Sequence, residues 1–202
     1  MATPLINRIH IACLFTVAGL SLSACIPAAV GGATTAGVFV AQERSFGTAI
    51  DDSTIRTAIT RRYLEKDVND LLTGVGVEVH EGRVLLTGEV VKPETAIEAV
   101  KLAWQADGVK EVINEIQVTN RAGMKNFAQD AWITNQVKGR LVAEKGVASL
   151  NFSIETVNNV VYVMGIARSE TELQKVLNVA SRVKGVQRVV SHVVLKNDPR
   201  RG

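Results

Sequence analysis

Apolar residues recur at every fourth position in two stretches of the chain. The recurring positions are Ile55, Ile59 and Tyr63 in one stretch and Ile133, Val137 and Leu141 in the other. This spacing predicts a helix with one buried face in each stretch. An aspartate precedes each row, Asp52 in the first and Asp130 in the second. We expect each aspartate to cap the N-terminus of its helix.

Alternating apolar and polar residues follow each predicted helix. The runs are VGVEVH from Val75 and RVLLTGEV from Arg83, then NFSIET from Asn151 and VVYVMGIA from Val160. Alternation of this kind predicts strands with one buried face. Glu81-Gly82 separates the first pair of runs, and Asn158-Asn159 lies between the second pair. We therefore expect two antiparallel hairpins with tight turns.

A second helix and a third strand are predicted to complete each stretch. The helices are expected over residues 93–106 and 169–183, with Pro93 acceptable in a first turn. Gly108 and Gly185 follow as helix-stop residues. The β-branched runs after them, over 109–119 and 186–196, predict the last strands.

These elements form an internal repeat, which we place at residues 51–120 and 129–198, with a linker at 121–128 and a tail at 199–202. Gly88 aligns with Gly165, and Gly108 aligns with Gly185. The predicted fold class is α+β. Each copy is expected to be an α-β-β-α-β domain in which a three-stranded mixed sheet packs under two helices.

The N-terminus has the pattern of a bacterial lipoprotein signal over residues 1–24. Arg8 provides the positive charge, residues 11–20 form an apolar run, and LSAC ends at Cys25. We expect cleavage before Cys25 and acylation of its thiol, with a tether over residues 25–50. The alternatives are a plain signal peptidase site with an incidental cysteine, or an uncleaved anchor.

The two copies resemble the BON domain. The resemblance rests on the opening helix, on strands that end in LLTG or VYVMG, and on the pattern GV..V.N.I.V after the second helix. A lipobox, a tether and tandem copies together resemble the dual-BON outer-membrane lipoproteins. This resemblance implies phospholipid binding and support of envelope integrity, not catalysis. Ile26 after the cysteine, where aspartate marks inner-membrane retention, implies a periplasm-facing place in the outer membrane.

Charge distinguishes the two copies. Residues 51–120 hold thirteen acidic and eight basic residues, a net charge of −5, whereas residues 129–198 hold six acidic and nine basic residues, a net charge of +3. Cations near an anionic membrane surface each contribute about 1 kcal/mol of attraction. We therefore expect the second copy, and not the first, to bind anionic phospholipid.

Trp132 is the candidate centre of that binding. It lies one residue before the buried row, hence about 100° around the helix, and an indole is favourable at a membrane interface. The predicted lipid-docking face consists of Trp132, Ile133, Gln136, Lys138 and Arg140. The alternative is that Trp132 packs against the first copy or against Phe127. For Trp104, which has acidic neighbours, we expect no binding role.

Little in the sequence points to catalysis. Past the signal only His80 and His192 remain as histidines, both cysteines lie within the first 25 residues, and no catalytic motif occurs. We expect no cofactor, no metal site and no small-molecule substrate. The secretion signal and an aromatic content of 4% disfavour nucleic acid as a partner. The alternative function is a lipid-tethered scaffold for envelope assembly or peptidoglycan-remodelling proteins.

Overall fold

The computed structural model describes residues 46–120, 127–199 and 201. The predicted signal, Cys25 and most of the tether lie outside the described residues. The first domain consists of α2 (Phe46–Lys66), a π-helical turn η1 (Val68–Leu72), β1 (Val75–His80), β2 (Arg83–Val90), α3 (Pro93–Trp104) and β3 (Glu111–Val118). The second consists of α4 (Phe127–Ala143), a 3₁₀ turn η2 (Ser149–Asn151), β4 (Phe152–Val157), β5 (Val160–Ala167), α5 (Glu170–Ser181) and β6 (Arg188–Leu195).

Each domain contains one three-stranded mixed sheet. The strand orders are β1-β2-β3 and β4-β5-β6, in which the central strand pairs antiparallel with the first and parallel with the third. A parallel pair needs a crossover connection, which α3 and α5 provide. The predicted fold class, two tandem α+β domains with mixed sheets under helices, is confirmed.

The predicted apolar rows form the cores. Ile59, Ile133 and Val137 are fully buried under their sheets, together with the small residues of the second helices. Tyr63 is buried as well, and its hydroxyl donates to the carbonyl oxygen of Ala99 at 2.9 Å, which joins α2 to α3. Burial raises the pKa of Tyr63 far above its ordinary value.

The aspartates do not cap the helices, so this prediction was wrong. Helix α2 begins at Phe46, inside the range predicted as tether, and α4 begins at Phe127, inside the predicted linker. The carboxylates of Asp52 and Asp130 instead accept hydrogen bonds from the hairpin turns. The pairs are Asp52 with the amides of Glu81 and Gly82, both at 2.9 Å, and Asp130 with those of Asn158 at 2.8 Å and Asn159 at 2.9 Å.

The turn geometry explains this arrangement. All four turn residues have positive φ, between 50° and 78°, which corresponds to the tight turn that matches the twist of a hairpin. The two central amides of each turn are satisfied by one carboxylate. The aspartate therefore links the first helix of each domain to its hairpin.

We expect Asp52→Ala to destabilise the first domain by about 1–3 kcal/mol, since two amides lose their acceptor in a buried position. Urea denaturation would measure the loss. The exposed neighbour Asp51 provides the matched control, and Asp51→Ala should leave the midpoint unchanged. Equal midpoints for the two variants would show that the turn does not depend on this carboxylate.

The glycine of the LLTG and VYVMG motifs is required by close packing between strands. Gly88 and Gly165 have φ of 120° and 150°. A Cβ atom there would lie 2.1 Å from the carbonyl oxygen of Gly74 and 2.0 Å from that of Asn151. Neither position can accept another residue without moving the backbone just before the adjacent strand.

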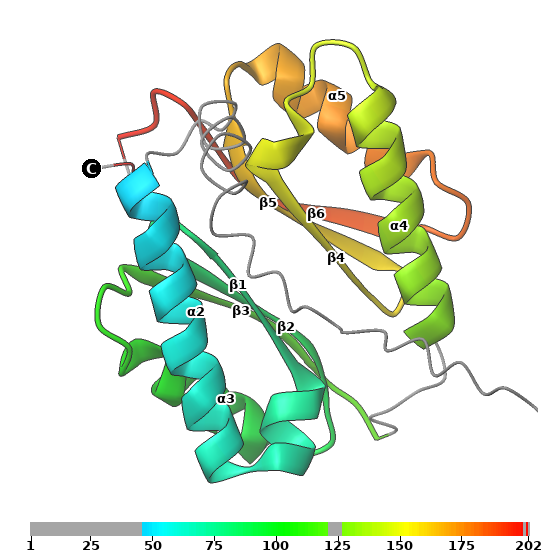
Figure 1. The fold of residues 1–202 in the computed structure, drawn as a ribbon. Coiled ribbons are helices and arrows are strands. Elements are labelled where there is room, and N and C mark those ends of the chain that lie inside the picture. The colour runs from blue at the N-terminus through cyan, green and yellow to red at the C-terminus, as the bar shows by residue number, and fades with distance from the viewer. Residues whose placement is uncertain (1–45, 121–126, 200, 202) are drawn as a thin grey trace, which may run out of the picture.

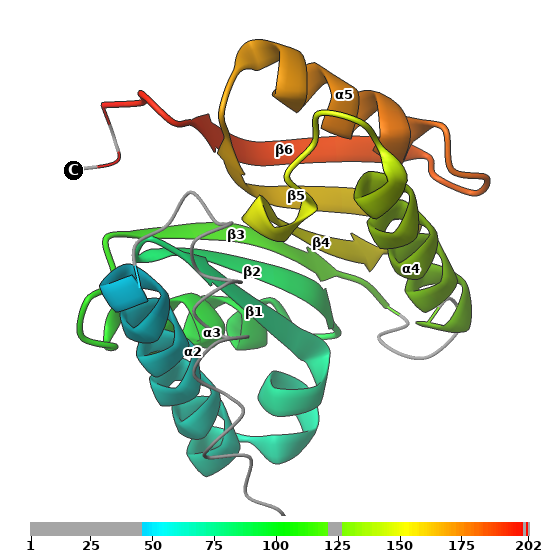
Figure 2. The same ribbon diagram turned by 45° about the horizontal axis from the view of Figure 1, so that its top comes forward.

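The two sheets pack face to face, with the helices on the outside (Figures 1 and 2). The centre of this interface is Leu85, Tyr162 and Met164, each at most 1% exposed. Strand positions in the two copies differ by 77, as Gly88 and Gly165 do, so Leu85 and Tyr162 are equivalent positions that meet. The domains therefore associate much as two related subunits would across a two-fold axis.

Polar contacts surround this apolar centre. His192 lies 3.0 Å from Glu115, its equivalent in the other copy, and His80 lies 2.8 Å from the hydroxyl of Ser153. Gln117 donates to the hydroxyl of Tyr162 at 3.2 Å. Both histidines thus have structural contacts between the domains.

The C-terminal tail also connects the domains. The guanidinium of Arg201 donates twice to the carboxylate of Glu81 in the first hairpin, at 2.8 Å each. The tail is therefore bound to the first domain through Arg201. The cores and the interface all lie within residues 46–201, and residues 43–202 therefore contain the whole described fold.

Candidate functional site

The structure removes one residue from the predicted lipid-docking face. Ile133 is fully buried in the second core, where it packs in the same row as Val137 and Leu141. It cannot contact a membrane while the domain is folded. Its inclusion was wrong because proximity in sequence to Trp132 does not place it on the same side of the helix.

Trp132, Gln136 and Arg140 do share one side of α4, since they are four residues apart. The side chain of Trp132 is 46% exposed, and that of Arg140 is exposed. Phe127, the alternative partner of Trp132, is 75% exposed. The indole is therefore half accessible at the surface.

Lys138 lies two residues beyond Gln136, which places it on another side of α4. It lines a cleft between the two domains, and its ammonium group lies 3.8 Å from the carboxylate of Glu155. The five predicted residues are thus distributed over the core, an outer side and the cleft. Only Trp132, Gln136 and Arg140 remain as one surface.

The turn after α5 extends this surface. Arg140 donates to the carbonyl oxygen of Arg182 at 3.5 Å, and Gly185 packs so closely that a Cβ there would lie 3.2 Å from Nε2 of Gln129 on α4. Arg182 and Lys184 are both exposed on this turn. We define the α4–α5 face as Trp132, Gln136, Arg140, Arg182 and Lys184.

Sequence reasoning missed Arg182 and Lys184 because they are far from Trp132 along the chain. The signal that could have found them is the repeat itself. Arg62 donates to the carbonyl oxygen of Gln105 at 2.9 Å in the first domain, as Arg140 does to Arg182 in the second. In both domains an arginine at this position of the first helix donates to the C-terminal end of the second helix, so the arginine predicts that the two are close together.

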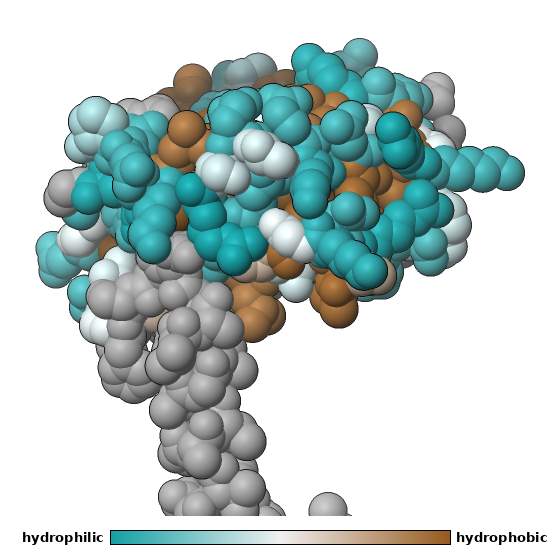
Figure 3. Space-filling model, turned by 90° about the horizontal axis from the view of Figure 1, so that it is seen from above, coloured by the Kyte–Doolittle hydropathy of each residue, from teal (hydrophilic) through white to brown (hydrophobic). Residues whose placement is uncertain are grey.

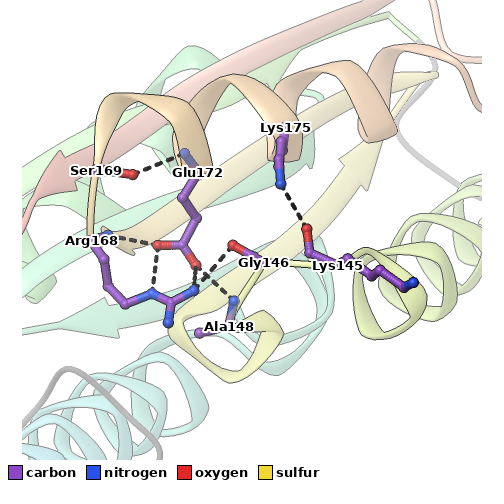
Figure 4. Close-up of polar contacts among 7 residues, drawn as sticks. All are labelled: Lys145, Gly146, Ala148, Arg168, Ser169, Glu172 and Lys175. Carbon is purple, nitrogen blue, oxygen red and sulfur yellow. Dashed lines mark hydrogen bonds and ion pairs between the residues drawn. The ribbon is translucent and has the colours of Figure 1, made fainter.

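Another charged group, Glu172, is buried at the start of α5 (Figure 4). Its carboxylate accepts from the amides of Ala148 and Arg168, both at 2.7 Å, and from the guanidinium of Arg168 at 2.8 and 3.0 Å. Burial opposes ionisation, but these hydrogen bonds and the Arg168 charge outweigh it, so the pKa of Glu172 lies below its ordinary value. Ser169 caps the helix by accepting from the Glu172 amide at 3.2 Å.

This cluster has a structural role, since it holds the loop after α4 against α5. The ammonium group of Lys175 also donates to the carbonyl oxygen of Lys145 in that loop, at 2.8 Å. The sequence carried a signal for it, because Ser169 and Glu172 have the spacing of a capping box.

The described residues contain no group of three or more histidine, cysteine, aspartate or glutamate side chains arranged to hold a metal ion. Within the same residues, no helix has the length and apolar composition needed to cross a membrane. The surface viewed from above in Figure 3 is largely hydrophilic, and apolar side chains appear there in small groups.

The chain belongs to the BON domain family, whose model matches residues 51–120 and 129–197. It is thus a protein with two BON domains, as the motifs indicated. It is 44% identical over 149 residues to the "Uncharacterized protein in gshII 5'region" of Anaplasma centrale, across 73% of this chain and 97% of that protein.

Two further relatives have descriptive names. The chain is 29% identical over 174 residues to "Outer membrane lipoprotein DolP" of Haemophilus influenzae, covering 86% of this chain and 89% of that one. It is also 29% identical to "Osmotically-inducible protein Y" of Escherichia coli, across 74% of this chain and 75% of that protein. The chain is therefore a dual-BON protein similar to DolP.

Proposed function

We propose that this protein is a periplasm-facing lipoprotein of the outer membrane that binds anionic phospholipid through its second BON domain and thereby supports envelope integrity. The observation that carries the proposal is the half-exposed Trp132 on the same side of α4 as the exposed Arg140, which donates to the turn that holds the exposed Arg182 and Lys184. The protein acts by binding and not by catalysis.

The chemistry of the α4–α5 face suits a lipid headgroup region. An indole buries its ring at the interface while its N–H stays hydrated. Arg140, Arg182 and Lys184 add attraction for lipid phosphate, of about 1 kcal/mol each before salt screening. The first domain, with its net charge of −5, would be repelled by the same surface.

The similarity to an outer membrane lipoprotein supports the proposed location. Acylation of Cys25 would hold the chain at the membrane, because each buried CH₂ contributes about 0.8 kcal/mol. With the anchor already in place, the α4–α5 face needs only modest affinity to orient the second domain on the bilayer.

We expect Trp132→Glu to weaken binding of residues 43–202 to anionic liposomes about tenfold, which corresponds to ~1.4 kcal/mol. The change removes the indole and adds a negative charge beside lipid phosphate. Co-sedimentation with liposomes of graded phosphatidylglycerol content measures it, at low and moderate salt. Binding of the unmodified protein should rise with anionic content and fall with salt.

Trp104→Glu is the matched control. Trp104 is 51% exposed, similar to Trp132, but lies on α3 of the acidic domain. This variant should sediment like the unmodified protein. Equal losses for both variants, or binding that does not depend on anionic lipid, would rule out a lipid-binding second domain.

A further inference from the structure

A cleft of about 880 Å³ lies between the domains, on a side of α4 other than that of Trp132. Gly74, Gly76 and Gly88, at the open end of the first hairpin, line one part of it. Ala131, Thr134 and Lys138 of α4 form one wall, and Glu155 of β4 lies beside them. Phe127 and Val91, which are 75% and 53% exposed, add apolar surface to the lining.

The other copy shows what Glu155 lacks. The residue equivalent to Glu155 in the first domain is Glu78. The carboxylate of Glu78 lies 2.5 Å from the guanidinium of Arg56 on α2. Helix positions in the two copies differ by 78, as Asp52 and Asp130 do, so Thr134 stands where the second copy would need that arginine. The first domain thus supplies its own guanidinium at a position where the second has none.

The charges around Glu155 do not replace that arginine. Burial and the neighbouring carboxylate of Glu78 raise the pKa of Glu155, and the charges of Lys138 and Arg56 only partly oppose this. Lys138 lies 3.8 Å away and is half exposed, so it stabilises the carboxylate weakly. Arg56 is already paired with Glu78. A further cation at Glu155 would therefore be favourable.

We propose that this cleft binds an extended basic segment of a partner protein, with an arginine or lysine side chain paired to Glu155. In the bound state the cation takes the place that Arg56 occupies at Glu78. An apolar neighbour of that residue packs on Phe127 and Val91. The volume is within the range of pockets that enclose ligands.

Charge supports a basic partner. Asp70 and Glu89 line the cleft together with Glu155, whereas Lys138 is the cation among the lining residues. The first domain as a whole carries a net charge of −5. Trp132 and the cleft are on different sides of α4. A partner protein in the cleft therefore leaves the α4–α5 face free to contact a membrane. This binding goes beyond the proposed lipid contact and does not depend on it.

The probe is an acetylated and amidated pentapeptide with a central arginine between two valines and an alanine at each end. Its control carries citrulline, which has the shape of arginine without the charge. Titration of isotope-labelled residues 43–202 should shift the amide signals of Gly74, Gly76 and Gly88 with the arginine peptide. The citrulline peptide should bind about tenfold more weakly, as expected for loss of a charge-assisted hydrogen bond.

Two variants test the position of the cation. Glu155→Gln should weaken the arginine peptide about tenfold, while Glu144→Gln, elsewhere in the second domain, should not. Thr134→Arg introduces the arginine that the first copy has at the equivalent position. Its guanidinium should pair with Glu155 and so abolish binding of the peptide. If Thr134→Arg loses its native spectrum, Glu155→Gln decides the matter alone.

Equal binding of the arginine and citrulline peptides would overturn the proposal. So would shifts confined to residues outside the cleft, or undiminished binding by Glu155→Gln. Equal shifts with free arginine amide at the same concentration would show that the cleft recognises a small cation and not a protein segment, which also contradicts the proposal.

Discussion

Replacing Glu172 with alanine is expected to destabilise the second domain by about 2–4 kcal/mol. The carboxylate is 3% exposed and accepts from two backbone amides and from Arg168. Removing it leaves both amides without this acceptor and releases the loop that contains Ala148 (Figure 4). The partly exposed Arg168 can return to water, which limits the loss. Chemical denaturation followed by circular dichroism measures the change.

The contribution of Glu172 to the stability of the second domain should also depend on pH. Its pKa is lowered in the folded state, so its contribution is complete above the pKa of the unfolded chain, near 4.5. The contribution is lost as the pH falls through the lower folded value. The stability difference between the unmodified protein and Glu172→Gln should therefore narrow as the pH drops below about 4.5. Glu170→Gln, at an exposed position of α5, should show no such trend.

Tyr162→Ala is expected to cost about 3–5 kcal/mol and to uncouple the two domains. The ring fills the centre of the interface with Leu85 and Met164 and belongs to neither domain core. The intact interface couples the domains, so calorimetry should show one unfolding transition for the unmodified protein. Each domain has its own core, so the uncoupled variant should show two transitions.

Tyr162→Phe provides the control for this prediction. It keeps the packing and loses only the hydrogen bond from Gln117, so it should cost about 0.5–1.5 kcal/mol and retain a single transition. A single transition at an unchanged temperature for Tyr162→Ala would mean that the sheet faces do not stabilise the assembly.

Much of the fold follows from the sequence because local patterns determine it. Rows such as Ile133 and Val137 identify the helices, and alternation fixes the strands, so Val75–His80 and Arg83–Val90 have the expected bounds. The helix starts were misplaced because Asp52 and Asp130 have the residue type of an N-cap. Their partners are turn amides of hairpins about thirty residues away, and only the folded chain brings them together.

The interface between the sheets was not predicted. In each sheet the face turned away from the helices carries polar residues on its third strand, such as Gln117 on β3 and His192 on β6, which are typical of a solvated surface. The structure pairs His192 with Glu115 across the domains. Such a pairing depends on how the two copies are oriented, which neither copy's sequence specifies alone.

The candidate lipid face was predicted in part. Trp132 is half exposed, but Ile133 lies in the core and Lys138 lies at the cleft. The prediction grouped residues that are neighbours in sequence, whereas a helix surface groups residues three or four apart. Arg182 and Lys184 come from a turn that the chain reaches only after a complete hairpin and a second helix.

The most direct test of lipid binding uses Trp132 itself as the reporter. The chain has two tryptophans, so Trp104→Phe leaves Trp132 as its only indole. Adding phosphatidylglycerol vesicles should shift its emission to the blue, and brominated acyl chains should quench it, while phosphatidylcholine vesicles should do neither. Unshifted, unquenched emission from protein that co-sediments with the anionic vesicles would contradict a membrane contact through the second BON domain.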